Sequence, residues 1–179
     1  MTLALTNATF IDRNATSVRT GTLVVSEGTN GTIDFNSNVP PGAHAIDCTG
    51  KIVTPAFVVA HHHIYSALAR GMPAPPRSPR NFVEILELIW WRLDKALDLD
   101  MVRASAHAVA IDALKSGVTF VIDHHASPNA APGSLHAIAE VLDEAGVGHL
   151  LCYELSDRDG SERFEQGLQE TDAYLTNHQ

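Results

Sequence analysis

The chain has 179 residues, of which 45% are hydrophobic and 18% charged, and its net charge is −9 at pH 7 with neutral histidines. So much apolar sequence supports a buried core and argues against disorder, while the negative charge argues against nucleic acid or an anionic membrane surface as a partner. No apolar run reaches the roughly 18 residues of a transmembrane helix and the N-terminus lacks signal-peptide regions, so we expect a cytoplasmic protein.

Residues 1–50 predict a small β-domain of sandwich type. Residues 3–6, 22–26 and 31–35 are rich in β-branched and apolar side chains, as is typical of short strands. The pair Asn30–Gly31 favours a two-residue hairpin turn, because both residues tolerate positive φ. The Pro40–Gly42 stretch then predicts a loop.

The pattern changes at Lys51. The segment IVTPAFVVA is almost continuously apolar, which predicts one strand buried on both faces of a parallel sheet. A proline-rich loop over residues 73–79 follows. Apolar residues at spacings of three and four then predict one helix with a single buried stripe. The stripe consists of Val83, Leu86, Trp90, Leu93 and Leu97.

Helices and strands alternate over the rest of the chain. A second helix is predicted from an N-cap at Asp100, followed by the strand VTFVID, which ends at His124 and His125. A third helix is predicted with Ser134 as its cap and Leu135, Ile138 and Leu142 on its buried face. The strand VGHLLCYEL and a last helix from Ser161 complete the order. This alternation predicts an α/β fold with a parallel sheet. Cys48 and Cys152 are expected to be buried, reduced thiols.

Three histidines follow the apolar segment directly. Residues two apart in a strand share a face, so His61 and His63 point the same way, with Cα atoms about 6.5 Å apart, and His62 points the other way. Two imidazoles at this spacing can converge on one divalent metal. The carboxyl end of a buried parallel strand is also where α/β barrels carry their chemistry. The pattern therefore predicts a metal site.

These residues carry a family resemblance. The segment Gly50–Phe57 and the HxH of His61 and His63 resemble the opening of the barrel in the amidohydrolase superfamily. Residues Ile64–Gly71 are similar to its aminohydrolase branch, which holds guanine, 8-oxoguanine and adenosine-type deaminases and the triazine chlorohydrolases, and most of all to the SsnA-like aminohydrolases. Ala56 is a departure, since the family usually has glycine there.

The resemblance implies a small β-domain (residues 1–50) followed by the first part, about three strands, of a (β/α)8 barrel (residues 51–179). It implies one catalytic divalent metal, zinc or iron, bound by His61 and His63 together with ligands from later strands. Such a metal activates a water molecule for attack on an amidine-like ring carbon. The implied substrate is a purine-like or other small nitrogen heterocycle, which loses ammonia.

The resemblance also implies substrate contacts. Tyr65, Ser66 and Arg70 would lie in the first loop over the pocket, although a solvated ion pair is an equal alternative for Arg70. His124 and His125 face opposite sides of their strand, so only one of them can line the pocket. We take His125 as the candidate.

The predicted site is incomplete. A whole barrel takes about 250 residues, and residues 51–179 are about half of that. After Leu155 the only histidine is His178, so the ligands that the family takes from later strands have no counterpart. We expect a fragment or one subunit of a split hydrolase; the alternatives are an inactive binding or regulatory module and a flavodoxin-like protein without metal. Open strand edges predict an oligomer or a complementary polypeptide.

Overall fold

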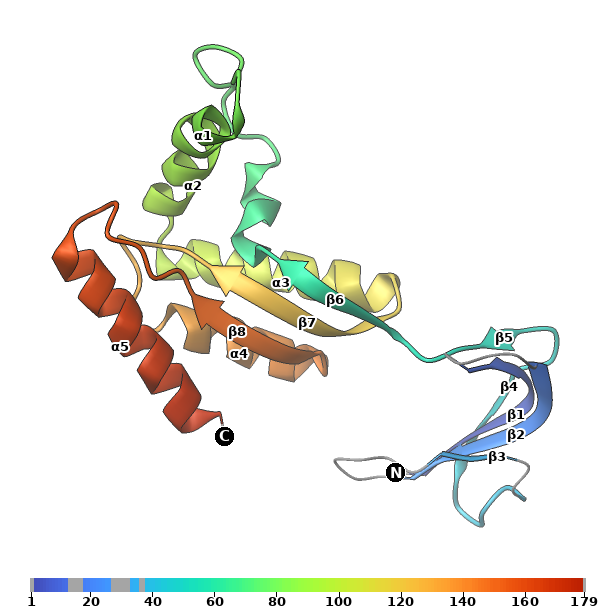
Figure 1. Ribbon diagram of the computed structural model, residues 1–179. Coiled ribbons are helices and arrows are strands. Elements are labelled where there is room, and N and C mark those ends of the chain that lie inside the picture. Colours follow the sequence, from blue (N-terminus) through green and yellow to red (C-terminus); the bar gives the residue numbers. More distant parts are fainter. Residues whose placement is uncertain (1, 13–17, 27–32, 36–37, 179) are drawn as a thin grey trace. The chain divides into compact units, whose positions relative to one another are not determined.

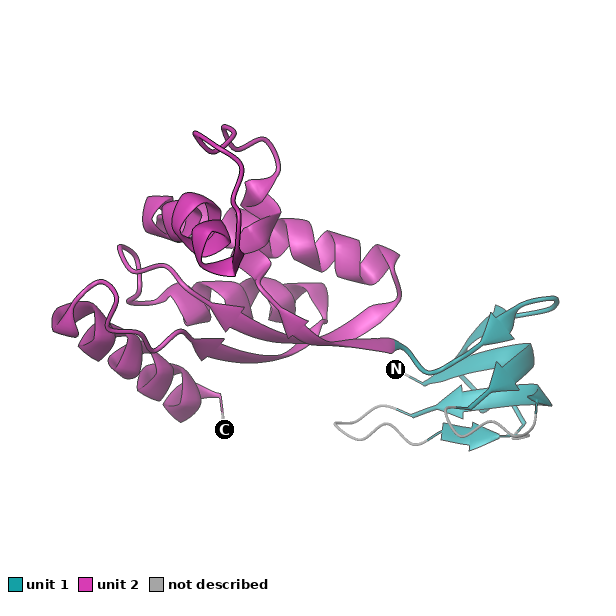
Figure 2. Ribbon diagram, turned by 45° about the horizontal axis from the view of Figure 1, so that its top comes forward, with its two compact units in different colours: residues 1–56 teal, residues 57–179 magenta. Residues whose placement is uncertain are grey.

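The computed structural model describes residues 2–12, 18–26, 33–35 and 38–178. The chain divides into two compact units, residues 1–56 and 57–179 (Figure 2). The boundary falls after Ala56 and not after Gly50, because Ile52 and Val53 pair with the first strand of the first unit. No helix within the described ranges is both long enough and apolar enough to cross a membrane.

In its described part, the first unit is one five-stranded sheet and contains no second sheet. Its strands are β1 (Leu3–Ile11), β2 (Val18–Val25), β3 (Ile33–Phe35), β4 (His44–Asp47) and β5 (Ile52–Val53). Strand β1 is antiparallel to β2 and parallel to β4 and β5. The three predicted strands are confirmed as β1, β2 and β3, whereas the turn predicted at Asn30–Gly31 lies outside the described residues.

The second unit is built on a parallel sheet in the order β6–β7–β8. The strands are β6 (Phe57–His62), β7 (Val118–His125) and β8 (Gly148–Tyr153), and the long helices are α3 (Leu99–Lys115), α4 (Ser134–Ala145) and α5 (Ser161–Asn177). Helices α3 and α4 cover one face of the sheet (Figure 1). The predicted α/β fold with a parallel sheet is confirmed.

The prediction of one long strand over IVTPAFVVA is wrong. Strands β5 and β6 belong to different units and are separated by residues 54–56. Pro55 has no N–H to donate to a strand ladder, so it suits this break. Strand β6 is also not buried on both faces, because the adjacent residues Phe57 and Val58, which point to opposite faces, are 66% and 48% exposed. Among the described residues, β6 pairs only with β7.

The segment predicted as the first helix consists of three short pieces. They are α1 (Phe82–Ile85), the π-helical turn η2 (Leu86–Trp90) and α2 (Trp91–Ala96). A separate 3₁₀-helix, η1 (Ile64–Ala69), follows β6 and precedes the proline-rich loop. A π-turn changes the side-chain register, so Leu93 and Leu97 are buried but Val83 is 54% exposed. The N-cap of α3 is Asp98 and not Asp100, since the Asp98 carboxylate accepts from the Met101 N–H at 2.7 Å.

Helix α4 supplies the centre of the core. Leu135, Ile138 and Leu142 are fully buried, as their spacing predicts. Ser134 is the first residue of the helix and not its cap. Instead, the Glu170 carboxylate of α5 accepts from the backbone N–H groups of Gly133 at 2.6 Å and Leu135 at 2.8 Å. A side chain of α5 therefore caps the N-terminus of α4.

Replacing Glu170 by alanine should lower the free energy of unfolding by about 1–3 kcal/mol, because the N–H of the buried Leu135 and that of Gly133 would both lose a charged acceptor. Urea denaturation measures this change. The control is Glu165→Ala, on the exposed side of the same helix, where a change within about 0.5 kcal/mol is expected. Equal effects of the two substitutions would contradict a capping role for Glu170.

Candidate metal centre

The end of β6 brings His61 and His63 together. Their Nε2 atoms lie 3.1 Å apart, and the two rings meet edge to face with centroids 4.9 Å apart. A divalent ion binds imidazole nitrogen at about 2.0–2.1 Å, so one ion can contact both nitrogens. In the described part of the chain, no group of three or more histidine, cysteine or acidic side chains is arranged to hold a metal.

Strand β7 orients His63. The His63 Nδ1 atom lies 2.9 Å from the backbone carbonyl oxygen of His124. A carbonyl oxygen only accepts, so Nδ1 carries the proton and donates it. The lone pair of a neutral His63 imidazole is then on Nε2, the atom that faces His61. Metal-binding histidines are commonly held in one tautomer by such a bond.

Asp123 of β7 holds the backbone that follows the histidines. Its side chain is fully buried, and its Oδ1 accepts from the Ile64 N–H at 2.6 Å. The same oxygen is 3.7 Å from Nδ1 of His62. Sequence reasoning missed this residue. The available signal was a carboxylate at the end of an otherwise apolar strand.

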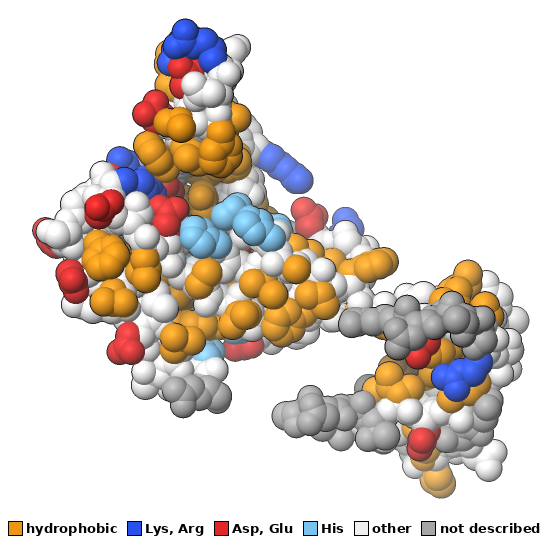
Figure 3. Space-filling model, in the orientation of Figure 1, with side chains coloured by type: hydrophobic (Ala, Val, Ile, Leu, Met, Phe, Trp, Pro, Cys, Tyr) orange, Lys and Arg blue, Asp and Glu red, His pale blue; other side chains and the backbone are white. Residues whose placement is uncertain are grey.

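A cavity of about 330 Å³ opens beside the histidines. Its lining comprises Ala60, His61, His62, His63, Ile122, Asp123, His124 and Cys152. Figure 3 shows histidine side chains gathered in one patch with hydrophobic side chains on either side of it. The expectation that Cys152 is buried is wrong, because its side chain is exposed on a strand at the open edge of the described sheet.

The predicted substrate contacts do not gather at this cavity. Tyr65 is only 6% exposed, and its ring packs against the rings of His63 and His125. Ser66 and Arg70 line a different cavity of about 580 Å³, between β6 and α3. The Arg70 side chain is 86% exposed and lies 4.0 Å from Asp112, which matches the solvated ion-pair alternative.

His124 lines the cavity, and His125 does not. His125 is fully buried, its ring lies 5.7 Å from that of Tyr65 and 5.9 Å from that of Tyr153, and its Nε2 is 2.9 Å from the Ser127 hydroxyl. Burial lowers the pKa of His125 to about 3, because a charged imidazole would lose its hydration. Side-chain alternation along the strand correctly predicts that only one of the two histidines lines the cavity. That residue is His124, whereas the prediction was His125.

His125 should therefore stay neutral down to about pH 4, while the unfolded chain takes up a proton near pH 6.5. Its contribution to the free energy of unfolding is complete above pH 6.5 and is lost as the pH falls toward 3. Imidazole NMR signals followed from pH 8 to pH 4 test this. A His125 signal with a midpoint near 6.5 would contradict its burial as a neutral group.

Known proteins resemble most of the chain. The profile of the amidohydrolase family matches residues 52–176. The 5-methylthioadenosine/S-adenosylhomocysteine deaminase 2 of Archaeoglobus fulgidus is 30% identical over 131 residues, which are 73% of this chain and 29% of the relative. The 8-oxoguanine deaminase of Pseudomonas aeruginosa is 26% identical over 140 residues, 75% of this chain and 30% of the relative.

Solved structures show the same fold. The guanine deaminase of E. coli is 15% identical, with a TM-score of 0.71 over 98% of this chain and 43% of that one. A mutant of the atrazine chlorohydrolase TrzN from Arthrobacter aurescens, complexed with zinc and atraton, is 22% identical, with a TM-score of 0.68 over 84% of this chain and 35% of that one. The chain thus spans about a third of the length of the curated relatives it matches.

Proposed function

The chain belongs to the amidohydrolase family, and we propose that it supplies the first part of the active site of a metal-dependent hydrolase that deaminates a purine-like or other nitrogen heterocycle. The observation that carries the proposal is the convergence of the His61 and His63 Nε2 atoms at 3.1 Å, with His63 held by the His124 carbonyl. The named activities of the deaminase relatives support the choice of substrate class.

His61 and His63 would hold one divalent ion, zinc or iron, both of which accept imidazole ligands. The related TrzN mutant was solved as a complex with zinc. When bound, such an ion lowers the pKa of a bound water molecule and so supplies a nucleophile at neutral pH. The contribution of this chain is to fix the tautomer of His63 through the His124 carbonyl and to anchor the next peptide N–H on Asp123.

Two imidazoles leave most of a metal's coordination positions to other groups. We propose that these groups and the proton-transfer residues lie outside these 179 residues, on a longer form of the same chain, on a complementary polypeptide or on another subunit of an oligomer. The exposed apolar side chains on the two outer strands of the described sheet support this, with Phe57 of β6 66% exposed and Leu150 of β8 51% exposed. Unpaired strand edges favour pairing with another chain.

We further propose a cytoplasmic location. The support is that Cys48 and Cys152 are both free thiols, as is usual in a reducing compartment. We propose neither nucleic acid nor a membrane as a partner, in keeping with the net charge of −9.

The proposal is tested by ammonia release. The purified chain is loaded with Zn²⁺ or Fe²⁺ and mixed with 5′-methylthioadenosine, 8-oxoguanine, guanine or a triazine, alone and together with a complementary polypeptide. We expect release that disappears in His61→Ala and His63→Ala and persists in His107→Ala, an exposed histidine of α3. Release that survives loss of both His61 and His63 would contradict the proposal.

A catalytically inactive binding module is the second candidate. It is favoured by the lack of a metal-binding group of three or more side chains within the described ranges. A chain that binds metal through His61 and His63 but releases no ammonia under any of these conditions would support this candidate.

A further inference from the structure

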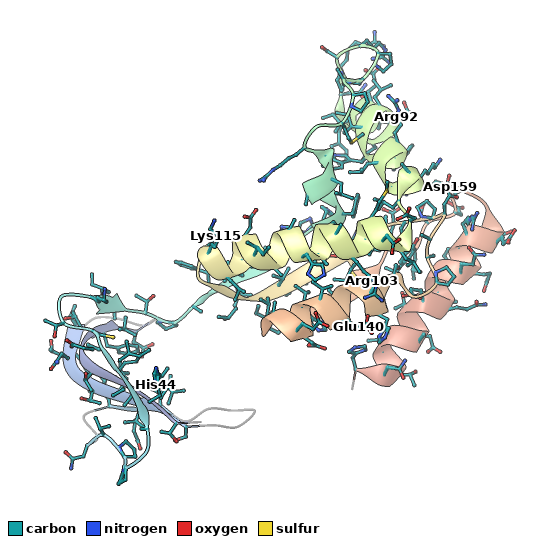
Figure 4. All side chains as sticks on the ribbon, turned by 180° about the vertical axis from the view of Figure 1, so that it is seen from behind. His44, Arg92, Arg103, Lys115, Glu140 and Asp159 are labelled. Carbon is teal, nitrogen blue, oxygen red and sulfur yellow. The ribbon has the colours of Figure 1, made fainter. Side chains whose placement is uncertain are left out.

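His124 lies near the carboxyl end of β7, on the face of the sheet opposite to α3 and α4. On the covered side, these two helices are joined by the ion pair of Arg103 with Glu140 at 2.7 Å (Figure 4). Side chains alternate along a strand, so the fully buried His125 points toward the core and His124 points the other way. There His124 lines the histidine cavity, and its side chain is within reach of a molecule bound in that cavity.

The surroundings of His124 suit a small ligand with apolar faces. The cavity has a volume of about 330 Å³, and Ala60 and Ile122 contribute apolar parts of its wall. On the neighbouring strand β8, Cys152 is paired in register with His124 and also lines the cavity. Ligand pockets span about 300–1,000 Å³ and combine apolar walls with a few polar groups. This cavity lies at the small end of that range, which fits a single ring system.

The imidazole of His124 forms no hydrogen bond with the described part of the protein. Its Nδ1 atom is buried and has no partner among the described residues. Its ring meets that of His63 edge to face, with the centroids 5.4 Å apart. In contrast, His61, His63 and His125 each have a ring nitrogen within 3.1 Å of another polar atom. A buried polar atom without a partner in a native protein calls for an explanation, and a ligand of the cavity supplies one for this ring.

The position of the proton on the His124 ring decides which ligand atom the ring can bind. A neutral imidazole carries one N–H and one lone pair. Buried N–H groups without an acceptor are rarer than buried acceptors without a donor, so the lone pair is on the unpartnered Nδ1 and the proton is on Nε2. Nε2 lies farther from the backbone than Nδ1 and is not among the buried atoms that lack a partner. The ring therefore offers an N–H to the cavity.

We propose that His124 is a substrate-contacting residue, which donates its Nε2–H to a ring nitrogen of the bound heterocycle. The proposal rests on the hydrolase function proposed above and adds one contact with its substrate. The two parts of His124 then have different roles: the backbone carbonyl holds Nδ1 of His63 at 2.9 Å, and the side chain selects the ligand. A site that donates a hydrogen bond rejects a ligand without the acceptor, because its own polar group is then left unpaired.

The test combines a change in the residue with a change in the ligand. Calorimetry measures the binding of adenine and of 1-deaza-, 3-deaza- and 7-deazaadenine, in each of which a C–H replaces one ring nitrogen. The chain is used with and without added Zn²⁺. The wild type should bind adenine about 10-fold more tightly than one of the three analogues. His124→Phe should lose this preference, binding adenine about 10-fold more weakly than the wild type and that analogue equally well.

Two further variants separate the donor from the ring. The amide nitrogen of glutamine reaches the position of the histidine Nε2, whereas that of asparagine reaches the position of Nδ1. His124→Gln should therefore bind adenine within about 3-fold of the wild type, and His124→Asn should lose as much affinity as His124→Phe. His107→Phe is the matched control, because His107 is an exposed histidine of α3 outside the cavity. Its affinities should equal those of the wild type.

The outcomes that overturn the inference are distinct from those that contradict the proposed function. Equal adenine affinity of His124→Phe and the wild type would overturn the inference. A wild type that binds adenine and all three analogues equally, or none of them at millimolar concentration, would also overturn it. The Zn²⁺ affinity of His124→Phe should be unchanged, because the carbonyl that holds His63 belongs to the backbone. A wild type that binds no Zn²⁺ would contradict the proposed function, and the adenine comparison without metal would still decide the inference.

Discussion

Replacing His61 or His63 by alanine should lower the affinity of the chain for Zn²⁺ by about 100-fold, and replacing both should abolish specific binding. Structural zinc sites bind with about 10–16 kcal/mol over four ligands, so one ligand accounts for roughly 3 kcal/mol, or about two powers of ten. Both imidazoles present Nε2 to the same point, 3.1 Å apart, and each is therefore needed. Competition with a chromophoric chelator measures the affinity, and elemental analysis measures the stoichiometry.

The control for the metal prediction is His107→Ala. His107 is an exposed residue of α3 and lies outside the cavity that the histidines line. Its removal should leave both affinity and stoichiometry unchanged. Full zinc binding by the His61→Ala and His63→Ala double variant would show that the metal is held elsewhere.

Replacing Ile138 by alanine should lower the free energy of unfolding of the second unit by about 2–5 kcal/mol. The Ile138 side chain is fully buried in the core around α4, so the substitution removes apolar contacts and leaves a cavity. Urea denaturation followed by tryptophan fluorescence measures the change. The chain has two tryptophans, Trp90 and Trp91, and both lie in the second unit, so their signal follows that unit alone.

Ile111→Ala on α3 is the matched control, because it makes the same substitution in a helix at a side chain that is 57% exposed. Helix propensity favours alanine equally at both positions, so the difference between the variants isolates burial. We expect Ile111→Ala to stay within about 0.5–1 kcal/mol of the wild type. A loss below about 1 kcal/mol for Ile138→Ala would contradict its place in the core.

Local periodicity accounts for the predictions that are confirmed. The stripe of Leu135, Ile138 and Leu142 predicts the buried face of α4, because a helix places every third or fourth residue on one side. The same kind of argument places His61 and His63 on one face of a strand, and the structure brings their Nε2 atoms together. These patterns depend only on residues close in the chain.

Predictions that depended on contacts with residues far away in the sequence were wrong more often. The apolar run after Lys51 reads as one strand, but Ile52 and Val53 pair with β1 and the following residues pair with β7. The π-turn before Trp91 changes which side chains of the first helical segment are buried. A pattern of apolar residues does not identify the strand that each residue will meet.

The sequence by itself determined the alternation of strands and helices, the family resemblance and the two converging histidines, because each follows from short-range spacing. The tertiary structure alone decided that His124 and not His125 lines the cavity, that Glu170 caps α4, and that Asp94 meets Arg158 across 64 positions. Each of these choices depends on which side of an element faces the core. That is set by packing between distant segments, and local composition does not encode it.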